Sequence, residues 1–358
     1  MRQKLFNTKR VTRRTALPLC LTAALVLSAC AESSTSGSSG EEQTVELKIA
    51  DYLPEGDYHI EHGLKVFMES AEEMSDGSIT FEHYPAEQLA AAADQLDATG
   101  SGLADISLLG VTYHTDKLPL AGVCALPGAF SKVTQGTEAC WEVTQSPEIQ
   151  EEYLGNDVRP IYTTVNEPYG LQTRDVKVEK LEDLKGMKLR SGGGDMSLLL
   201  SRLGAVPVEM SGPETYEGVQ RGTLDGIVYP ILSLPPYDLG GPLDYGITGI
   251  NLGSFLHTMA INEQTWQGLS KDQQEALMLA GEEVMSSYSR WVDDNTRPVI
   301  EEIEGDGDME FYELPEDEVE RLNEHSEVIS EQWAEEMTKR NFAGEAVWTS
   351  WQNALGDS

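Results

Sequence analysis

The stretch 181–230 constrains the fold more than any other part of the chain. It reads LEDLKGMKLRSGGGDMSLLLSRLGAVPVEMSGPETYEGVQRGTLDGIVYP. Three short apolar runs, at 187–189, 206–210 and 224–228, alternate with two segments of helical periodicity that each end at a glycine. The order strand, helix, strand, helix, strand is typical of a largely parallel sheet flanked by helices. The chain is therefore predicted to be an α/β protein.

Two residues of this stretch stand where ligands bind in such sheets. Ligands lie at the carboxyl ends of parallel strands, and Arg190 and Tyr229 each end a predicted strand. A guanidinium is a planar fork of donors that matches a carboxylate, and the glycines at 192–194 leave room for a ligand to approach. We predict a carboxylate-binding site. The residues alone leave an alternative open, in which Arg190 is a surface cation paired with Asp195.

The first 29 residues have the pattern of a secretory signal peptide. Residues 1–14 contain six Lys or Arg and no acidic residue, and an apolar segment too short to span a membrane follows at 16–29. Cys30 comes directly after it, as in a bacterial lipobox, which implies that Cys30 is lipidated. A twin-arginine signal remains an alternative to a plain one. Residues 30–43 are rich in Ser and Gly and are expected to be a flexible tether.

The charge balance excludes several classes of partner. The chain has 61 acidic and 25 basic residues, a formal net charge of −36 at pH 7. Nucleic acid and anionic membrane surfaces are poor partners for such a surface, so an anionic ligand must be bound by local donors. A solvated acidic surface, as a saline habitat would favour, explains the composition. Calcium binding does not, because no Asp-x-Asp-x-Asp-Gly loop is present.

No residue pattern supports catalysis, a metal site or a cofactor. There is no Gly-x-Ser-x-Gly motif, and the GGGD run lacks the Gly-Lys-Ser/Thr ending of a phosphate loop. His59 and His62 could hold a metal, but no third ligand stands near them, and a solvated first turn of a helix is the simpler interpretation. Cys124 and Cys140 could form a disulfide or remain two buried thiols; the sequence favours neither.

A repeated unit suggests two lobes. A helical segment, a Gly-x-x-Asp turn and an apolar strand occur at Gly102 and Asp105 and again at Gly222 and Asp225. Two similar α/β units in an exported chain indicate a two-lobed fold like that of periplasmic binding proteins, with a mostly parallel sheet flanked by helices in each lobe and the ligand held between them.

Several segments also resemble one family in the same order. They are YPAEQL, ALPGAF, DLKGMKLR, LGAVPVEM, ETYEGVQRGTLDG and INEQTWQGLSKDQQ. Over residues 45–351 the chain resembles the substrate-binding proteins of TRAP transporters, the DctP family. The resemblance implies that the protein captures an organic acid in the cleft and delivers it to an ion-gradient-driven membrane permease. It implies an extracytoplasmic, lipid-anchored protein, and we expect a monomer.

The resemblance also implies a division of the chain. One lobe is expected at 44–165 plus 255–295 and the other at 166–254 plus 296–358. A long helix that begins near residue 270 is expected to lie across both lobes.

Further ligand-binding residues follow from the resemblance. They lie after predicted strands, where relatives bind their ligand: Tyr52, Tyr113, Asn166 and Tyr169, in addition to Arg190 and Tyr229. Members that bind sialic acid have a second Arg near the position of Asn166, which this chain lacks. One arginine with several tyrosines suits a monocarboxylate with an apolar or aromatic body.

Two other functions remain compatible with the sequence. The protein could present its ligand to a sensor kinase, in which case permease genes would not neighbour its own. It could also be an exported hydrolase on a binding-protein-like fold, which product analysis would detect.

Overall fold

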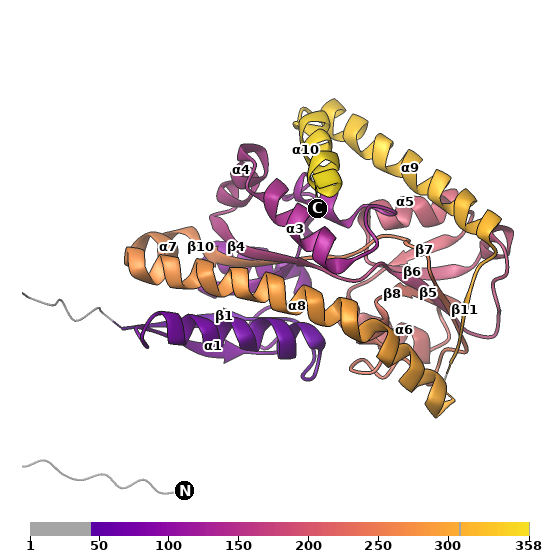
Figure 1. The fold of residues 1–358 in the computed structure, drawn as a ribbon, viewed down its shortest axis with the longest axis horizontal. Helices are drawn as coiled ribbons and strands as arrows, with labels where there is room; N and C mark the ends of the chain where they lie inside the picture. Colours follow the sequence, from indigo (N-terminus) through magenta and orange to yellow (C-terminus); the bar gives the residue numbers. More distant parts are fainter. Residues whose placement is uncertain (1–43, 308, 358) are drawn as a thin grey trace, which may run out of the picture. The chain divides into compact units, whose positions relative to one another are not determined.

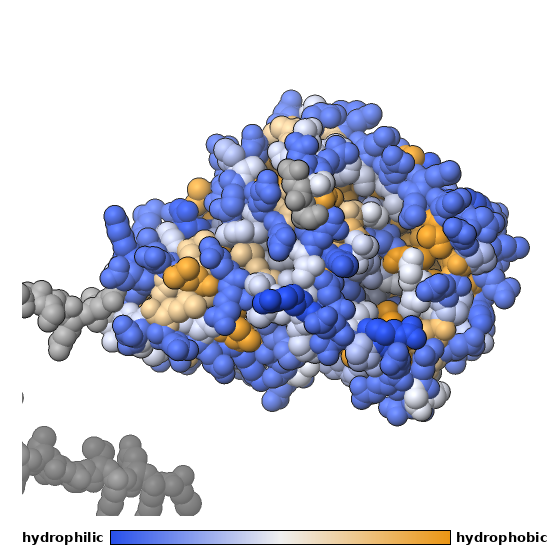
Figure 2. Space-filling view, viewed as in Figure 1, coloured by the Kyte–Doolittle hydropathy of each residue, from blue (hydrophilic) through white to orange (hydrophobic). Residues whose placement is uncertain are grey.

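The structure, a computed structural model, describes residues 44–307 and 309–357. They belong to one compact unit with two β-sheets and flanking helices (Figure 1). Hydrophilic residues cover most of the face shown in Figure 2, in keeping with the composition. Within the described ranges, no helix has both the length and the apolar character needed to cross a bilayer. The predicted signal peptide, the tether and Cys30 lie outside these ranges.

The first sheet has five strands in the order β2, β1, β3, β10, β4. Its strands are β1 (Val45–Ala50), β2 (Ile79–Tyr84), β3 (Ile106–Gly110), β4 (Val158–Val165) and β10 (Leu256–Asn262). β1 pairs in parallel with β2 and β3, whereas β10 runs antiparallel to β3 and β4. One strand of this sheet is therefore reversed.

The second sheet has six strands in the order β11, β9, β5, β8, β6, β7. Its strands are β5 (Gly170–Thr173), β6 (Lys188–Ser191), β7 (Val206–Glu209), β8 (Gly226–Tyr229), β9 (Tyr245–Thr248) and β11 (Glu310–Glu313). Here β5 alone runs antiparallel to its neighbours β8 and β9. The stretch 181–230 forms β6, β7 and β8 with their two helices, as predicted, and these three strands are parallel.

The reversed strand in each sheet is the one that follows a crossing. The chain passes from β4 to β5 through residues 166–169, and from β9 back to β10 through residues 249–255. The α/β prediction is confirmed, with the refinement that both sheets are mixed. A crossing strand arrives from the side of the other lobe, so it enters its new sheet pointing away from the cleft.

The repeated unit has the same structure in both sheets. Asp105 makes two hydrogen bonds to the backbone of Lys48. Its N–H donates to the Lys48 carbonyl and its carboxylate accepts from the Lys48 N–H, both at 2.9 Å. Asp225 does the same with Lys188, at 2.8 and 2.7 Å. The glycines of the two turns have φ of 76° and 64°, which a side chain would disfavour. The two lobes are thus built on one local plan.

Helix α8 (Lys271–Asp306) belongs to both lobes (Figure 1). It begins where the resemblance implies, with Ser270 capping its start, and Leu277 and Val284 pack into the core around the first sheet. The helical pattern ends near residue 292, but the helix continues through Pro298, and Ile300 and Ile303 pack against the second sheet's residues. Tertiary packing of the last turns outweighs the hydrogen bond that a proline removes.

The remaining helices cover the sheets and include three that the sequence pattern did not predict, α4, α7 and α10. Their bounds are α1 (Lys65–Met74), α2 (Gln95–Gly100), α3 (Val133–Thr144), α4 (Pro147–Gly155), α5 (Gly194–Arg202), α6 (Gly212–Gln220), α7 (Glu263–Gly268), α9 (Glu316–Lys339) and α10 (Gly344–Asp357). A five-residue π-helix (Ile60–Leu64) leads into α1. The Ala-rich segment 88–99, whose composition predicts a helix, is helical only from residue 92, as a 3-10 turn at 92–94 followed by α2.

The hydrophobic core divides between the sheets. One cluster surrounds the first sheet and includes α10 through Val347 and Trp351, and two others surround the second sheet. Cys124 and Cys140 form a disulfide inside the first cluster, which decides between the two alternatives left open by the sequence. The exact lobe boundaries given above stay a prediction.

Candidate functional site

A cavity of about 20 Å³ lies between residues of the two sheets. All six predicted ligand-binding residues line it: Tyr52, Tyr113, Asn166, Tyr169, Arg190 and Tyr229. Its wall is completed by others that include His59, Gly212, Tyr237, Phe255 and His257. The volume is about that of one water molecule. The cleft is therefore closed, and it must open before an organic acid can enter.

The direction of the strands explains why these residues meet. β1, β3 and β4 run parallel, and their carboxyl ends precede Tyr52, Tyr113 and Asn166. Arg190 and Tyr229 lie at the carboxyl ends of β6 and β8 in the other sheet. Because the carboxyl ends of parallel strands meet at one edge, each sheet presents these side chains to the same cleft.

Arg190 is the most unusual group in the cavity wall. Its side chain is 1% exposed, and its Nε and Nη2 both donate to the Met210 carbonyl, at 3.2 and 2.9 Å. Nη1 donates to the Val228 carbonyl at 3.2 Å, and the guanidinium lies over the Tyr229 ring, 4.8 Å from its centroid. These bonds use three of the five N–H groups. A second N–H on each terminal nitrogen remains for a further acceptor.

This buried cation has no anionic partner in the part of the chain that the structure describes. Among residues 44–307 and 309–357, no carboxylate lies within ion-pair distance of Arg190. The pairing with Asp195, which the sequence left open, does not form. Asp195 lies in the first turn of α5, and burial raises the pKa of its carboxyl to about 6. Burying an unpaired charge has an effective cost of several kcal/mol, so an anion that pairs with Arg190 would be strongly favoured.

The first lobe contributes hydrogen-bonding groups to the opposite wall. The Tyr52 hydroxyl lies 2.7 Å from His257 Nε2, and the Tyr113 hydroxyl accepts from the Gly212 N–H at 2.9 Å. Gly212 is the first residue of α6, so the second bond joins the first lobe to a helix N-terminus of the second. Helix N-termini favour negative charge. The donors Arg190 and Gly212 N–H therefore both face the first lobe.

A buried chain of hydrogen bonds supports this wall. Asp57 lies 2.7 Å from His59 Nδ1, and His59 Nε2 lies 2.8 Å from the Asn166 side-chain oxygen. The Asn166 amide donates to the Tyr169 hydroxyl at 3.0 Å. The prediction that His59 lies on a solvated turn is wrong, since its side chain is 4% exposed. Its burial depends on Asn166 and on α8, which no local pattern reveals.

The tyrosines of the cavity are neutral donors and acceptors. Burial raises the pKa of Tyr52, Tyr169 and Tyr229 above the usual value, and for Tyr169 and Tyr229 the nearby Arg190 opposes the shift. Burial also raises the pKa of Tyr113, against the opposing influence of Arg190. At neutral pH the wall therefore carries hydroxyl groups and no phenolate. No group of three or more His, Cys, Asp or Glu in the described part of the chain is arranged to hold a metal.

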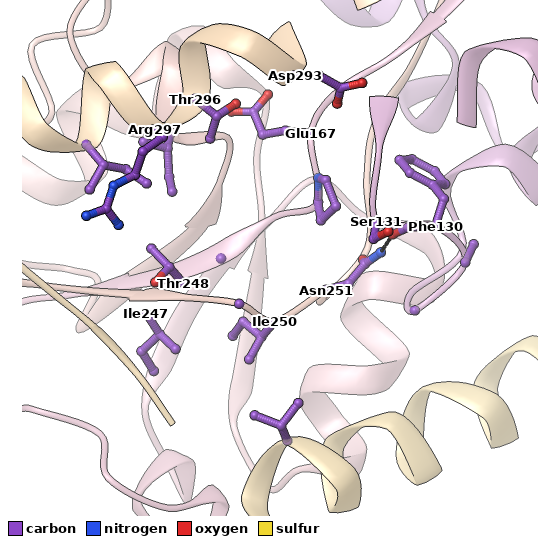
Figure 3. Close-up of a pocket in the computed structure, with 18 of the residues that line it drawn as sticks. Phe130, Ser131, Glu167, Ile247, Thr248, Ile250, Asn251, Asp293, Thr296 and Arg297 are labelled. Atoms are coloured by element: carbon purple, nitrogen blue, oxygen red, sulfur yellow. Dashed lines mark hydrogen bonds between the residues drawn. The ribbon is translucent and has the colours of Figure 1, made fainter. Parts of the chain in front are cut away.

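A larger cavity, of about 700 Å³, lies on the other side of the first crossing (Figure 3). It is lined by Glu167, by α8 residues that include Asp293 and Arg297, and by residues 247–251. Each of its charged groups has a partner in the chain. Glu167 accepts from Leu232 N–H and the Tyr58 hydroxyl, Asp293 accepts from two N–H groups at the start of α3, and Arg297 pairs with Glu301. This cavity is larger than the one at Arg190, but the unpaired charge lies at Arg190.

Comparison with known proteins gives one family. Residues 49–337 match the model of "Bacterial extracellular solute-binding protein, family 7". A solute-binding protein of Albidiferax ferrireducens is 26% identical over 250 residues, which cover 68% of this chain and 73% of the relative. The C4-dicarboxylate-binding periplasmic protein DctP of Rhodobacter capsulatus is 24% identical over 291 residues, which cover 78% of this chain and 84% of that one.

Solved structures of TRAP solute-binding proteins have the same fold. One from Rhodoferax ferrireducens, in complex with copurified benzoate, superposes with a TM-score of 0.81 at 24% identity, covering 88% of this chain and 98% of the other. One from Bordetella bronchiseptica, with bound mandelate, has a TM-score of 0.79 at 24% identity and coverages of 87% and 99%. The two-lobed architecture predicted from the sequence is therefore confirmed.

Proposed function

Because the chain belongs to family 7 of the bacterial extracellular solute-binding proteins, we propose that Arg190 and the residues around it bind the carboxylate of an organic acid between the two lobes. The family acts outside the cytoplasm and consists of binding proteins of transporters, so this protein is a TRAP solute-binding protein and not an enzyme. Its partner is a TRAP membrane permease, to which it delivers the bound acid.

One observation carries the site assignment: Arg190 is a buried cation without an anion. Nε and Nη2 of the guanidinium both donate to one carbonyl oxygen, that of Met210. A carboxylate would therefore accept from the N–H groups that remain on Nη1 and Nη2. A carboxylate there would form charge-assisted bonds in parallel and neutralise the guanidinium. The Gly212 N–H at the start of α6 would add a donor once the Tyr113 hydroxyl turns aside.

The ligand proposed for this site is a monocarboxylate with an aromatic or apolar body. Arg190 supplies the cavity's guanidinium, whereas aromatic rings form most of the rest of the wall, among them Tyr52, Tyr229 and Phe255. Flat rings would stack or pack edge-on against such a wall. Similar proteins of known structure hold benzoate and mandelate, which have this chemistry.

The test is calorimetry with benzoate and its neutral analogue benzamide. Wild type should bind benzoate and reject benzamide. Arg190→Ala should weaken benzoate binding at least tenfold and as much as several hundredfold, because a charge-assisted hydrogen bond contributes roughly 1.5–3 kcal/mol and about 1.4 kcal/mol is tenfold in affinity. Arg159→Ala is the matched control, since Arg159 lies outside the cavity. Full benzoate affinity in a folded Arg190→Ala protein would place the carboxylate elsewhere.

We also propose that a lipid on Cys30 anchors the protein, a monomer, to the outer face of a membrane. The support is the sequence pattern that ends at Cys30. Cys30→Ser should release the protein from the membrane fraction or leave its precursor uncut. Unchanged size together with unchanged membrane retention would refute the anchor, and a dimer in size-exclusion chromatography with light scattering would refute the monomer.

A further inference from the structure

One polar group in the cavity wall has an unused hydrogen-bonding atom. His257 is the second residue of β10, its side chain is 2% exposed, and it lines the cavity. Its Nε2 lies 2.7 Å from the Tyr52 hydroxyl. Its Nδ1 is buried and has no hydrogen-bond partner within the described ranges.

The ring of His257 is neutral. Burial lowers the pKa of His257 well below the usual value, and the nearby His59 lowers it further. A neutral imidazole has one N–H and one bare nitrogen, and Tyr52 engages only one of them. The other is a buried polar group without a partner, which costs free energy. A group that reaches Nδ1 would recover that free energy.

Two other polar side chains of the cavity wall, His59 and Asn166, are already engaged. His59 lies between Asp57 and Asn166, and the Asn166 amide donates to Tyr169. His257 therefore has an unused hydrogen-bonding atom, whereas these neighbours do not. Arg190 in the opposite wall likewise has unused N–H groups. Arg190 comes from the second sheet and His257 from the first, so the two incomplete groups lie in different lobes.

We propose that His257 is a specificity-determining residue that hydrogen-bonds a second polar group, a hydroxyl or carbonyl, on the body of the bound acid. The inference rests on the proposed function, because the carboxylate of the same ligand pairs with Arg190. The ligand class is thereby narrowed to organic acids with a hydrogen-bonding substituent away from the carboxylate. A hydroxyl satisfies either tautomer of His257, because it both donates and accepts. Such a ligand contacts both lobes and so favours their closed arrangement.

The test compares pairs of benzoates that differ only in hydrogen bonding. Calorimetry with 2-, 3- and 4-hydroxybenzoate, each against the methylbenzoate with the same substitution, separates a hydrogen bond from the filling of space. In wild type at least one hydroxybenzoate should bind about tenfold more tightly than its methyl counterpart. In His257→Phe this preference should fall to within twofold, while binding of the methylbenzoates changes little.

His114→Phe is the matched control. His114 is also a buried histidine of the first lobe with an unpartnered ring nitrogen, Nε2, among the described residues, but it does not line the cavity. Burial lowers the pKa of His114 to about 4, so it too is neutral. The preference for the hydroxybenzoate should survive this substitution. If His257→Phe does not fold, His257→Gln takes its place, and the preference should then shrink without a loss of methylbenzoate binding.

Three results would overturn the inference. Wild type would show no preference within any pair, or the preference would survive in both His257 variants, or His114→Phe would abolish it as well. Arg190→Ala separates these results from a failure of the proposed function, because it should weaken both members of every pair equally. If wild type binds none of the benzoates, the proposed aromatic ligand class is wrong and this inference falls with it.

Discussion

Two arginines of this protein stand on strands and lie over aromatic rings, yet their hydrogen-bond partners differ. Arg159 on β4 donates through Nε and Nη2 to both oxygens of Glu263, at 2.8 and 2.9 Å, and lies 5.6 Å from the Trp266 ring centroid. Arg190 on β6 donates to the backbone carbonyls of Met210 and Val228 and lies 4.8 Å from the Tyr229 ring centroid. Among the described residues, Arg159 has a carboxylate partner and Arg190 has none.

This difference is the basis for our proposal that Arg190 serves binding and Arg159 serves folding. Arg159 is 29% exposed and is satisfied by a bidentate partner. Arg190 is almost fully buried, where an unpaired charge is most unfavourable and where an incoming carboxylate gains most from pairing. A ligand carboxylate at Arg190 would use a different edge from the one that Glu263 uses at Arg159, because the Met210 carbonyl already accepts from Nε and Nη2.

The same substitution at both sites should give the largest contrast in binding. Arg190→Lys should lower the affinity for benzoate at least about tenfold, because an ammonium is a point donor and lacks the planar fork. Arg159→Lys should leave it within about twofold, since its side chain does not line the cavity. Calorimetry on both variants decides the matter. Equal losses would mean that the two arginines do not differ in role.

For the free energy of unfolding we expect the opposite: substitution of Arg159 should have the larger effect and substitution of Arg190 the smaller. Arg159→Met should lower the free energy of unfolding by about 1 kcal/mol, because it breaks a partly buried bidentate pair. Arg190→Met, measured without ligand, should not lower it, because the desolvation cost of the unpaired guanidinium offsets its bonds to carbonyls. Urea unfolding gives both values, and a double-mutant cycle with Glu263→Gln isolates the Arg159 pair. A larger loss for Arg190→Met would contradict the comparison.

The smallest effect concerns a partly buried carboxyl, that of Glu152, which unlike the Arg190 guanidinium can become neutral. Burial raises the pKa of Glu152 to about 7, although the N–H groups of Leu120 and Ala121 oppose the shift. Because the pKa of Glu152 is higher in the folded than in the unfolded protein, its protonation stabilises the fold. This contribution to the free energy of unfolding is complete below about pH 4.5 and is lost as pH rises through about 7. Because the side chain is partly exposed, we expect a difference of roughly 0.5–1 kcal/mol.

Glu152→Gln should therefore flatten the pH dependence of unfolding between pH 5 and 8, while substitution of its exposed neighbour, Glu151→Gln, should not. Urea unfolding at several pH values gives the curves. Parallel curves for wild type and Glu152→Gln would show that this carboxyl keeps its ordinary titration.

The sequence predicts the part of the site that follows from strand direction. Arg190 and Tyr229 end strands of a βαβαβ stretch, and the resemblance adds Tyr52 and Tyr113 after two parallel strands of the other sheet. In each case the carboxyl-end rule places the side chain, so a pattern of apolar runs is enough to find it. That these residues line one cavity is now seen; that they bind the ligand stays a prediction.

The residues that sequence analysis missed come from elements that this rule does not cover. Phe255 and His257 stand at the amino end of β10, the reversed strand, so the carboxyl-end rule does not point to them. His59 looks solvated locally and is buried only because Asn166 and α8 cover it. Helix α8 continues beyond its apolar pattern because its last turns pack against a hydrophobic cluster of the second sheet. All of these depend on contacts distant in sequence.

The position of β10 also governs the order in which the chain can fold. β10 lies between β3 and β4, but all of β5 to β9 separates it from β4 in sequence. As the chain emerges from the ribosome, the first sheet remains in two unjoined pieces until the second sheet's strands β5 to β9 have been made. Pairings between distant segments form slowly. The lobe that begins the chain therefore cannot be finished first, and a fragment that stops before residue 256 should contain neither a complete first sheet nor the strand that joins its halves.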